Sequence, residues 1–279
     1  MKINSITDTY KTHNEDIYGT TEHSFWILDG ALPLSKANYT KESNDVVWMV
    51  KWWNNYLSQH IDQLAKSIVT ILEEGMELLN IEFARYADIS KLSKLDRASA
   101  TISIVRINGE TIENYVLGDS EINIQTKKGT IETIIDEKAD ELDTQVINMI
   151  FNNQERSENI TFNGYTDEEL KVLRDNRMKM NSKDGYYILE HDVEGIKNGI
   201  YKEYELSDIL AILLMSDGYS AIYNKYKQLT QKQLMDACKN EELKKVLSRI
   251  RKVEDEDADF TKHKRLRLHD DATAIYINI

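Results

Sequence analysis

Several aspartates of this chain follow directly after apolar runs that we interpret as strands. If those strands end at the same edge of a sheet, the carboxylates lie close together. The stretch Phe25-Trp26-Ile27-Leu28 has the apolar character of a strand buried on both faces, and Asp29-Gly30 follows it directly. The apolar run at residues 209–215 is likewise followed by Ser216-Asp217-Gly218. Two such strands can bring two carboxylates together at one edge of a sheet. The full set of aspartates at predicted strand ends is Asp16, Asp29, Asp119, Asp217 and Asp270.

Clustered carboxylates repel one another unless a cation compensates their charge. Oxygen ligands alone select hard ions such as Mg²⁺, Mn²⁺ or Ca²⁺, whereas no spacing of Cys and His supports a zinc site. The glycine-rich motifs that cradle nucleotide phosphates are missing from the sequence. Two Mg²⁺ or Mn²⁺ ions about 4 Å apart would activate a bridging water and neutralise a phosphoryl group.

A structural role for these aspartates is the alternative. Asp-Gly is a common turn dipeptide, and each aspartate taken alone is more often a turn or cap residue than a metal ligand. Their recurrence at strand ends favours the metal site, although it leaves the turn interpretation open.

The composition narrows the class of protein. A chain of 279 residues fits one large domain, and its net charge of −13 argues against binding of nucleic acid or of anionic membranes. The single Cys238 excludes an internal disulfide framework. The longest apolar run, residues 209–215, is far below the ~20 residues of a membrane span, and the N-terminus lacks the apolar core of a signal peptide. We therefore expect a cytoplasmic protein.

The periodicity of apolar residues predicts a mixture of helices and antiparallel strands. From Val46 to about Tyr86 the spacing is helical and follows the N-cap residues Ser43-Asn44-Asp45, so we expect two helices with a break near Ser58 or Gly75. Residues 98–135 alternate instead, which predicts an antiparallel meander with a hairpin turn at Asn108-Gly109. Further strands are expected at the following places: residues 2–9, 25–30, 209–215 and 272–277.

Residues 136–207 are less regular than the rest of the chain. We expect helices at 141–151 and 167–174 and a strand at 186–190, all within an excursion from the core. Helices near 231–238 and 241–251 follow the Asp217 strand. The basic cluster Lys262, Lys264, Arg265 and Arg267 has two interpretations, an electropositive lip for phosphosubstrates or a solvated loop that balances an acidic run, and we favour the loop.

These residues, in this order and approximate spacing, resemble the metal-dependent protein phosphatase family, type 2C. The resemblance spans nearly the whole chain and rests on five motifs, each weak alone: Asn14-Glu15-Asp16, Leu28-Asp29-Gly30, Gly118-Asp119-Ser120, Ser216-Asp217-Gly218 and Asp270-Asp271-x-Thr273. It implies a single α+β domain over 1–279, a four-layer α-β-β-α sandwich of two antiparallel sheets flanked by antiparallel helices. The excursion at 136–207 stands where that family has a variable flap.

The resemblance also implies a function and a role for each site residue. It implies hydrolysis of phosphoserine and phosphothreonine in proteins by a water that bridges two Mn²⁺ or Mg²⁺ ions. Asp29 would bridge both ions and the carbonyl of Gly30 would bind one. Asp217 and Asp270 would hold the other. The remaining members are Glu15 and Asp16, which would act through metal-bound water, and Asp119, which would belong to a third, weaker site.

Three positions depart from the pattern of that family. Lys11 stands where the family usually has an arginine that grips the phosphate, and a lysine binds phosphate only as a point charge. Ala31 stands where many members have a histidine, a candidate general acid, and Glu121 where an arginine is usual. His13 lies near the first motif and is a candidate proton donor, although a lone histidine is more often structural.

Three functions remain open at this point. We favour the phosphoprotein phosphatase, with Lys11 and Asp29 as its catalytic residues. The first alternative is a catalytically weak or inactive binding module on the same fold, which the departures favour. The second is a phosphoesterase that acts on a small molecule. The sequence names neither the substrate nor the oligomeric state.

Overall fold

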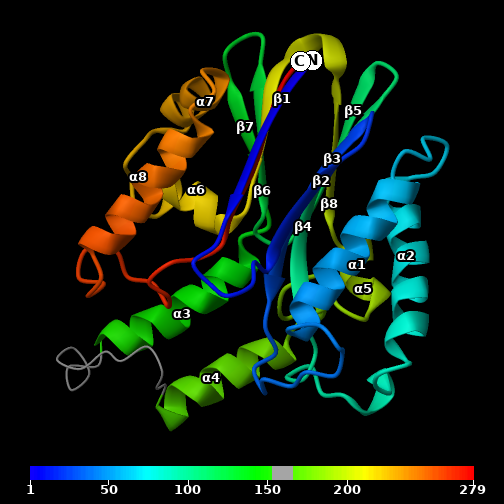
Figure 1. Cartoon of the computed structure of the whole chain (residues 1–279), viewed down its shortest axis with the longest axis vertical. Coiled ribbons are helices and arrows are strands. Elements are labelled where there is room, and N and C mark those ends of the chain that lie inside the picture. Colours follow the sequence, from blue (N-terminus) through cyan, green and yellow to red (C-terminus); the bar gives the residue numbers. More distant parts are fainter. Residues whose placement is uncertain (153–165) are drawn as a thin grey trace.

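The fold is a sandwich of two antiparallel sheets with helices on both outer faces (Figure 1). A computed structural model describes residues 1–152 and 166–279. The order of layers is helix, sheet, sheet, helix, so the predicted α-β-β-α sandwich is confirmed. The N- and C-terminal strands β1 and β10 pair with each other, which places the two termini side by side at one end of the sandwich (Figure 1).

Each sheet has five strands. We call the first the β9 sheet, with the order β1 (Lys2–Asp8), β10 (Ala272–Asn278), β9 (Ile209–Met215), β6 (Glu121–Thr126) and β7 (Ile131–Ile134). We call the second the β3 sheet, with the order β2 (Asp16–Thr20), β3 (Ser24–Ala31), β4 (Ser99–Asn108), β5 (Thr111–Leu117) and β8 (Ile200–Glu205).

The expected meander over residues 98–135 is wrong as a single unit. Strands β4 and β5 form the predicted hairpin, and β6 pairs with β7, but β5 and β6 belong to different sheets. The chain changes sheet at Gly118, whose φ of +89° is a left-handed conformation that glycine adopts without strain. Alternation along each strand is the same in both arrangements, so the sequence pattern could not separate them.

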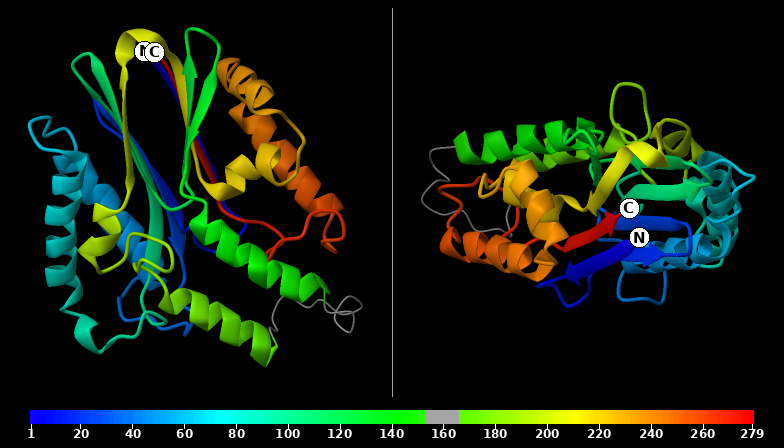
Figure 2. Two further views of the ribbon diagram at one scale, coloured as in Figure 1. Left: turned by 180° about the vertical axis from the view of Figure 1, so that it is seen from behind. Right: turned by 90° about the horizontal axis from the view of Figure 1, so that it is seen from above.

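Helices cover the outer face of each sheet. On the β3 sheet lie α1 (Asp45–His60) and α2 (Ile68–Phe83), with the short α5 (Val193–Lys197) beside α2. On the β9 sheet lie α6 (Asp217–Asn224), α7 (Gln231–Lys239) and α8 (Leu243–Glu256). The pair α3 (Lys138–Asn152) and α4 (Asp167–Met178) crosses the end of the sandwich opposite the termini (Figure 2). Among the described residues, no helix is long and apolar enough to cross a membrane.

Helix α1 begins where the cap residues predict. The side chain of Asn44 accepts a hydrogen bond from the backbone N–H of Val47 at 2.7 Å, which satisfies one of the free donors of the first turn. The helix ends at His60, and α2 begins at Ile68, so the break lies just beyond Ser58. Gly75 lies inside α2 and does not break the helix. Its missing side chain leaves room for two large rings of α1, Trp53 and Tyr56.

The space between the two sheets is filled by apolar side chains in rows. Phe25 and Ile27 of β3 pack in one cluster with Ile212 and Leu214 of β9 and Ile275 of β10. Because side chains alternate along a strand, the next residue on this inner face of each row is polar: Asp29, Ser216 and Thr273. The apolar interior therefore ends in a group of buried polar residues at the end of the sandwich near α3.

Residues 136–207 contain α3, α4, α5 and β8, and residues 153–165 lie outside the described part of the chain. Helices α3 and α4 bear out the two expected helices, whereas residues 186–190 form only isolated bridges, such as Ala100 with Leu189. The last part of the range belongs to the sheet, since β8 pairs with β5. A flap-type insertion remains a prediction for the part before β8.

Candidate metal centre

The site is built around two aspartates that face each other across neighbouring strands. Asp16 at the start of β2 is the direct cross-strand partner of Asp29 near the end of β3. Directly opposite residues of an antiparallel pair project from the same face, with Cβ atoms about 5 Å apart, so two like charges are held close together. Such a pair destabilises a sheet unless a cation or a proton compensates it.

Ser216 links this pair to the other sheet. Its hydroxyl donates to Oδ2 of Asp16 at 2.8 Å and accepts from the backbone N–H of Thr273 at 3.0 Å. The other carboxylate oxygen of Asp16, Oδ1, is buried and has no hydrogen-bond partner among the described residues. A buried carboxylate oxygen without a donor is costly, and a metal ion would satisfy it.

The pKa values of these carboxylates reflect their crowding. Burial, followed by the charges of Asp16, Asp217, Asp270 and Asp119, raises the pKa of Asp29 well above its usual value. Burial and then the charge of Asp271 raise the pKa of Asp16 to about 7. The four neighbours of Asp29 are the aspartates that the sequence predicts for the same site. A divalent cation among them would favour their charged forms.

Gly30 permits the close packing behind Asp29. Its N–H donates to the carbonyl of Glu15 at 3.1 Å, which joins the loop before β2 to the end of β3. A Cβ at this position would lie 2.1 Å from Cγ1 of Val46 in α1 and 2.9 Å from the carbonyl oxygen of Glu15. A side chain here would therefore push apart the strand, the helix and the loop that position the aspartates.

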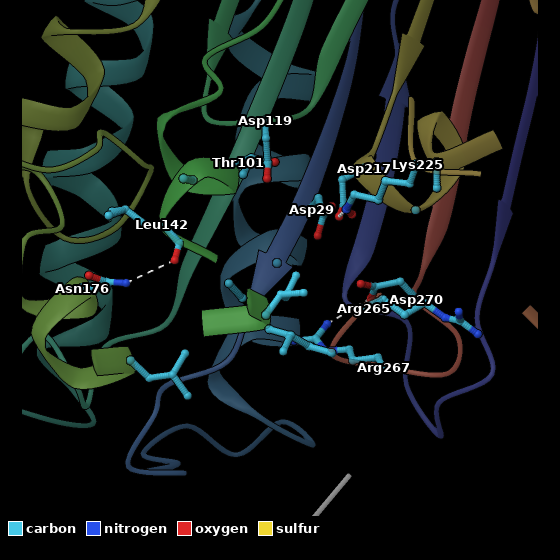
Figure 3. Close-up of a pocket in the computed structure, with 18 of the residues that line it drawn as sticks. Asp29, Thr101, Asp119, Leu142, Asn176, Asp217, Lys225, Arg265, Arg267 and Asp270 are labelled. Atoms are coloured by element: carbon cyan, nitrogen blue, oxygen red, sulfur yellow. Dashed lines mark hydrogen bonds and ion pairs between the residues drawn. The ribbon is translucent and has the colours of Figure 1, made fainter. Parts of the chain in front are cut away.

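A cavity of about 260 Å³ opens at this end of the sandwich (Figure 3). Five of the predicted residues line it: Asp29, Gly30, Asp119, Asp217 and Asp270. The other three predicted residues, Lys11, Glu15 and Asp16, lie next to these without lining the cavity. The opposite wall is apolar and comes from α3, α4 and the segment that follows, with Leu142, Leu173 and Ile188. The structure thus gathers the predicted set in one place, with the cavity between the carboxylates and the α3–α4 pair.

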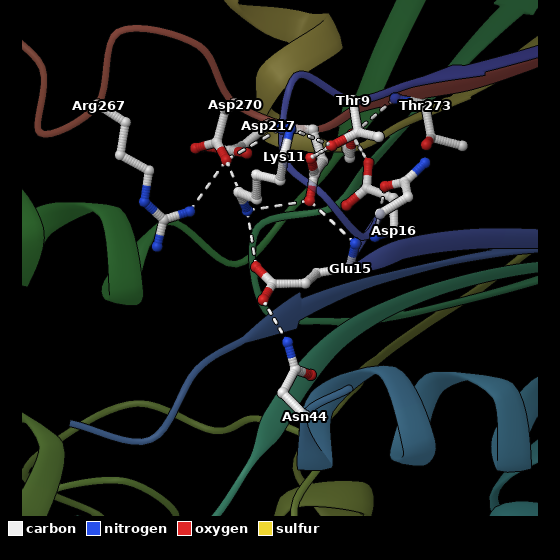
Figure 4. Close-up of polar contacts among 12 residues, drawn as sticks. Thr9, Lys11, Glu15, Asp16, Asn44, Asp217, Arg267, Asp270 and Thr273 are labelled. Carbon is white, nitrogen blue, oxygen red and sulfur yellow. Dashed lines mark hydrogen bonds and ion pairs between the residues drawn. The ribbon is translucent and has the colours of Figure 1, made fainter. Parts of the chain in front are cut away.

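Lys11 is surrounded by carboxylates (Figure 4). Its ammonium donates to Oε2 of Glu15 at 2.7 Å and to Oδ2 of Asp271 at 3.0 Å, and it lies 3.7 Å from Oδ1 of Asp270. Burial and the charge of Arg267 oppose its protonation, but Asp270 and Glu15 outweigh them and raise the pKa of Lys11. Glu15 is held from its other side by the amide of Asn44, at 3.0 Å.

Two further carboxylates of the site are each paired with a basic side chain. Lys225 contacts Asp217 at 3.0 Å, and Arg267 contacts Asp270 at 3.0 Å. Within the described residues, no three acidic, histidine or cysteine side chains are arranged to hold an ion as they stand. The donor set nevertheless fits Mn²⁺ or Mg²⁺, because it consists of oxygen atoms and includes the unpartnered Asp16 Oδ1.

The departures from the family pattern have separate locations. Ala31 lines the cavity and offers no proton donor. Glu121 lies on the other face of β6, where it accepts from the hydroxyl of Tyr223 in α6 at 2.6 Å, so it takes no part in the site. His13 is exposed and is not among the described residues that line the cavity. The departures that bear on the site are therefore Ala31, in the cavity wall, and Lys11, which contacts its carboxylates.

Sequence reasoning did not single out several residues that complete the site. Asp271 is almost fully buried and accepts from Thr9 Oγ1 at 2.5 Å, from Lys11 and from the backbone N–H of Glu15 at 3.0 Å. It therefore fixes the loop that carries Lys11 and Glu15. Ser216 and Lys225 are the others, whereas Arg267, which lines the cavity, belongs to the basic cluster for which the sequence offers an electropositive lip as one interpretation. The serine and Asp271 adjoin predicted residues, which was the available signal, whereas nothing in the sequence connects Lys225 with Asp217.

Comparison of the chain with family models identifies the class of protein to which this two-sheet sandwich belongs. Residues 11–252 match the model described as protein phosphatase 2C. The chain belongs to this family. No protein of curated function matches the sequence.

Several solved structures that match the fold are bacterial phosphatases. The serine/threonine phosphatase PstP/Ppp of Mycobacterium tuberculosis matches with a TM-score of 0.57 and 11% identity, over 100% of this chain and 98% of that one. Stp1 of Staphylococcus aureus matches with 0.54 and 13% identity, over 100% and 94%. A PstP catalytic domain in complex with two manganese ions matches with 0.52 and 13% identity, over 99% and 97%. At these identities the likeness shows the fold alone.

Proposed function

We propose that this protein hydrolyses phosphoserine and phosphothreonine in proteins with the help of two Mn²⁺ or Mg²⁺ ions. The observation that carries the proposal is the convergence of carboxylates from both sheets at one cavity: the buried Asp16 and the half-buried Asp29 from one sheet, and the half-buried Asp217 and Asp270 beside the other. Family membership and the manganese ions in a PstP domain support the choice of reaction and metal.

The roles of the residues follow from their places. Asp29 and the carbonyl of Gly30, with Asp217 and Asp270, would hold the two ions, and Glu15 and Asp16 would orient water around them. Asp119, which lines the same cavity as Asp217, is proposed for a third, weaker site (Figure 3). When bound at such a site, the ions lower the pKa of water and neutralise phosphoryl charge. Lys11 would hold Glu15 and Asp271 in position.

The test compares turnover with metal binding. We expect Mn²⁺-dependent hydrolysis of a phosphothreonine peptide that a chelator abolishes. Asp29→Asn should lose turnover and calorimetric Mn²⁺ binding together. The charges of all the other predicted ligand aspartates act on the carboxylate of Asp29, which places it at the centre of the set. The matched control is Asp208→Asn, which changes an exposed aspartate before β9. Unchanged Mn²⁺ binding in Asp29→Asn would refute the assigned site.

The binding-module alternative has one observation in its favour. Lys225 already neutralises Asp217, a proposed ion ligand, and Lys11 neutralises Glu15 and Asp271 beside the ligands. If the protein binds Mn²⁺ tightly and turns over no phosphopeptide or aryl phosphate, the module is the better description. Hydrolysis of aryl phosphate without hydrolysis of phosphopeptides would instead favour the small-molecule phosphoesterase. A cytoplasmic location stays a prediction.

A further inference from the structure

Most of the hydrogen-bond donors of the Lys11 ammonium are already used within the protein. An ammonium has three donors. Two of them are used by Glu15 at 2.7 Å and Asp271 at 3.0 Å, and Asp270 lies 3.7 Å away. Both bonded carboxylates are buried, with side chains only 3% exposed. A phosphoryl oxygen that bound Lys11 would have to displace a buried carboxylate, which would then lose its counter-charge.

Arg267 approaches the same place with free capacity. Its guanidinium donates from Nη1 to Oδ1 of Asp270 at 3.0 Å, which is its one hydrogen bond within the described part of the chain. A guanidinium has five donors in a planar fork that matches a phosphate. The side chain is 48% exposed and lines the cavity with Asp29 and Asp217 (Figure 3). Most of its donors are therefore available at the cavity.

The loop that carries Arg267 is held rigidly by its neighbour Arg265. The guanidinium of Arg265 is buried against Asp257, with Nη1 to Oδ2 at 2.7 Å, and donates to the carbonyls of Glu254, Asp257, His263 and Leu268 at 2.8–3.3 Å. The bond to the carbonyl of Leu268 fixes the backbone directly after Arg267. A donor on a fixed backbone loses less entropy when it binds an anion.

Lys11 and Arg267 meet at one oxygen. Oδ1 of Asp270 is 3.7 Å from the Lys11 ammonium and 3.0 Å from the Arg267 guanidinium (Figure 4). The two cations therefore flank a single carboxylate of the proposed metal site, the lysine from its buried side and the arginine from the side of the cavity.

We propose that Arg267, and not Lys11, binds the phosphoryl oxygens of the substrate, and that Lys11 serves as an internal counter-charge for Glu15 and Asp271. The inference rests on the proposed function. It moves the phosphate-binding cation from the N-terminal loop, where the family usually has an arginine, to the loop before β10. Either loop brings a cation to Asp270, so the exchange keeps a positive charge at the site.

The test measures binding of inorganic phosphate to the Mg²⁺-loaded protein by calorimetry. Arg267→Gln should weaken phosphate binding roughly 10- to 100-fold, since it removes charge-assisted hydrogen bonds worth about 1.5–3 kcal/mol. Arg267→Lys should restore part of the affinity as a point charge. Lys11→Met should change it less than about 3-fold, within the scatter of a long-range charge effect. Arg249→Gln, on the exposed face of α8, is the matched control.

Mg²⁺ titration and thermal melting of each variant establish that the metal binds and the protein is folded. Unchanged phosphate affinity in Arg267→Gln would overturn the inference, as would a parent protein that binds Mg²⁺ but no phosphate. A large loss in Lys11→Met alone would return the role to Lys11. Phosphate binding that depends on Arg267 without any phosphoester hydrolysis would uphold the inference and refute the enzymatic function.

Discussion

At the scale of single residues, the site is decided by the balance between buried carboxylates and the few cations that reach them. Glu15 and Asp271 are nearly inaccessible to solvent, and Lys11 is the cation that contacts both. Buried carboxylates that lose such a partner must take up a proton or remain uncompensated. Lys11 therefore contributes to folding as well as to the site.

Lys11→Met should lower the free energy of unfolding of the metal-free protein by about 1–3 kcal/mol at pH 7, because it removes charged hydrogen bonds from two buried groups. Urea unfolding in the presence of a chelator measures the change. The control is Lys51→Met, whose ion pair with Glu42 at 3.0 Å is exposed and worth at most about 1 kcal/mol. Equal losses in the two variants would show that the pairs of Lys11 are no stronger than a surface ion pair.

At the scale of elements, Arg177 attaches α4 to the core. Arg177 donates to Oγ of Ser99 at 2.7 Å and to the carbonyl of Leu32 at 2.6 Å, which connects the helix to the start of β4 and to the loop after β3. Because this helix forms part of the cavity wall, the attachment sets the distance between the α3–α4 pair and the carboxylates.

Arg177→Met should speed hydrogen exchange across α4 by roughly 5- to 10-fold, which corresponds to the loss of about 1 kcal/mol from local opening. Exchange in β3 and β9 should not change. Arg174→Met replaces an exposed arginine of the same helix and serves as the control. In the parent, we expect residues 136–207 outside β8 to exchange faster than residues 25–30 and 210–216, and uniform protection would contradict a flap.

A second feature at this scale is His191, which directly follows residues 186–190 and packs against α2. Nδ1 of His191 lies 2.8 Å from Oδ1 of Asn80, and its ring packs on Phe83. Burial, and then the charge of Arg97, lower the pKa of His191 to about 3. The unfolded chain takes up a proton on this ring below its ordinary pKa of about 6.5, while the folded protein does not. This residue's contribution to stability is therefore complete above pH 6.5 and is lost as the pH falls toward 3.

His191→Gln should remove this pH dependence. Between pH 7 and pH 4.5 the parent should lose about 2–3 kcal/mol more of its unfolding free energy than the variant does. Urea unfolding at the two pH values, with excess EDTA in both, measures the difference. His23→Gln, which replaces a solvent-exposed histidine, should behave like the parent. A parallel decline in parent and His191→Gln would mean that His191 is not neutral in the folded protein.

At the scale of the whole molecule, the proposed metal site joins the two sheets at the end opposite the termini (Figure 1). Asp16 and Asp29 belong to the β3 sheet, whereas Asp217 and Asp270 adjoin β9 and β10 of the other. Between the sheets at this end, a hydrogen bond from Ser216 to Asp16 makes one connection. The N–H of Glu15, which donates to Asp271, makes another. An ion held by carboxylates of both sheets would add a further connection that exists only in the folded state.

Mn²⁺ at about 100 times its dissociation constant should therefore raise the unfolding free energy by about 2.7 kcal/mol, or more if a second ion binds. Chelation should reverse the gain. Melting curves with and without Mn²⁺ test this, and Asp29→Asn should show no gain. A gain of the same size in Asp29→Asn would place the bound ion somewhere other than between the sheets.

Much of the fold followed from local sequence. Alternating and helical spacing located β1, β10, α1 and α2, because each pattern reflects which side of one element is buried. Continuous apolar runs located β3 and β9, which are buried on both faces. The apolar runs that stop at Asp29 and at Asp217 also marked the site. An apolar run that stops at a carboxylate must stop at the edge of the core. The strand-end aspartates could be proposed as one metal site from the residues themselves, whereas their individual roles, and the parts of Lys11, Glu15 and Gly30, came only through the likeness to a family.

Tertiary structure alone decided how these parts combine. The alternation of β4 to β7 is the same whether the four strands form one sheet or two, so the change of sheet at Gly118 could not be seen in the pattern. The same limit applied to charge. Lys11 and Asp271 are 260 positions apart in the sequence and 3.0 Å apart in the fold, because pairing of β1 with β10 brings their loops together. Spacing along the chain indicates which residues share a face of one element. The partner of a carboxylate, by contrast, can come from an element far away in the sequence, and only folding brings the two together.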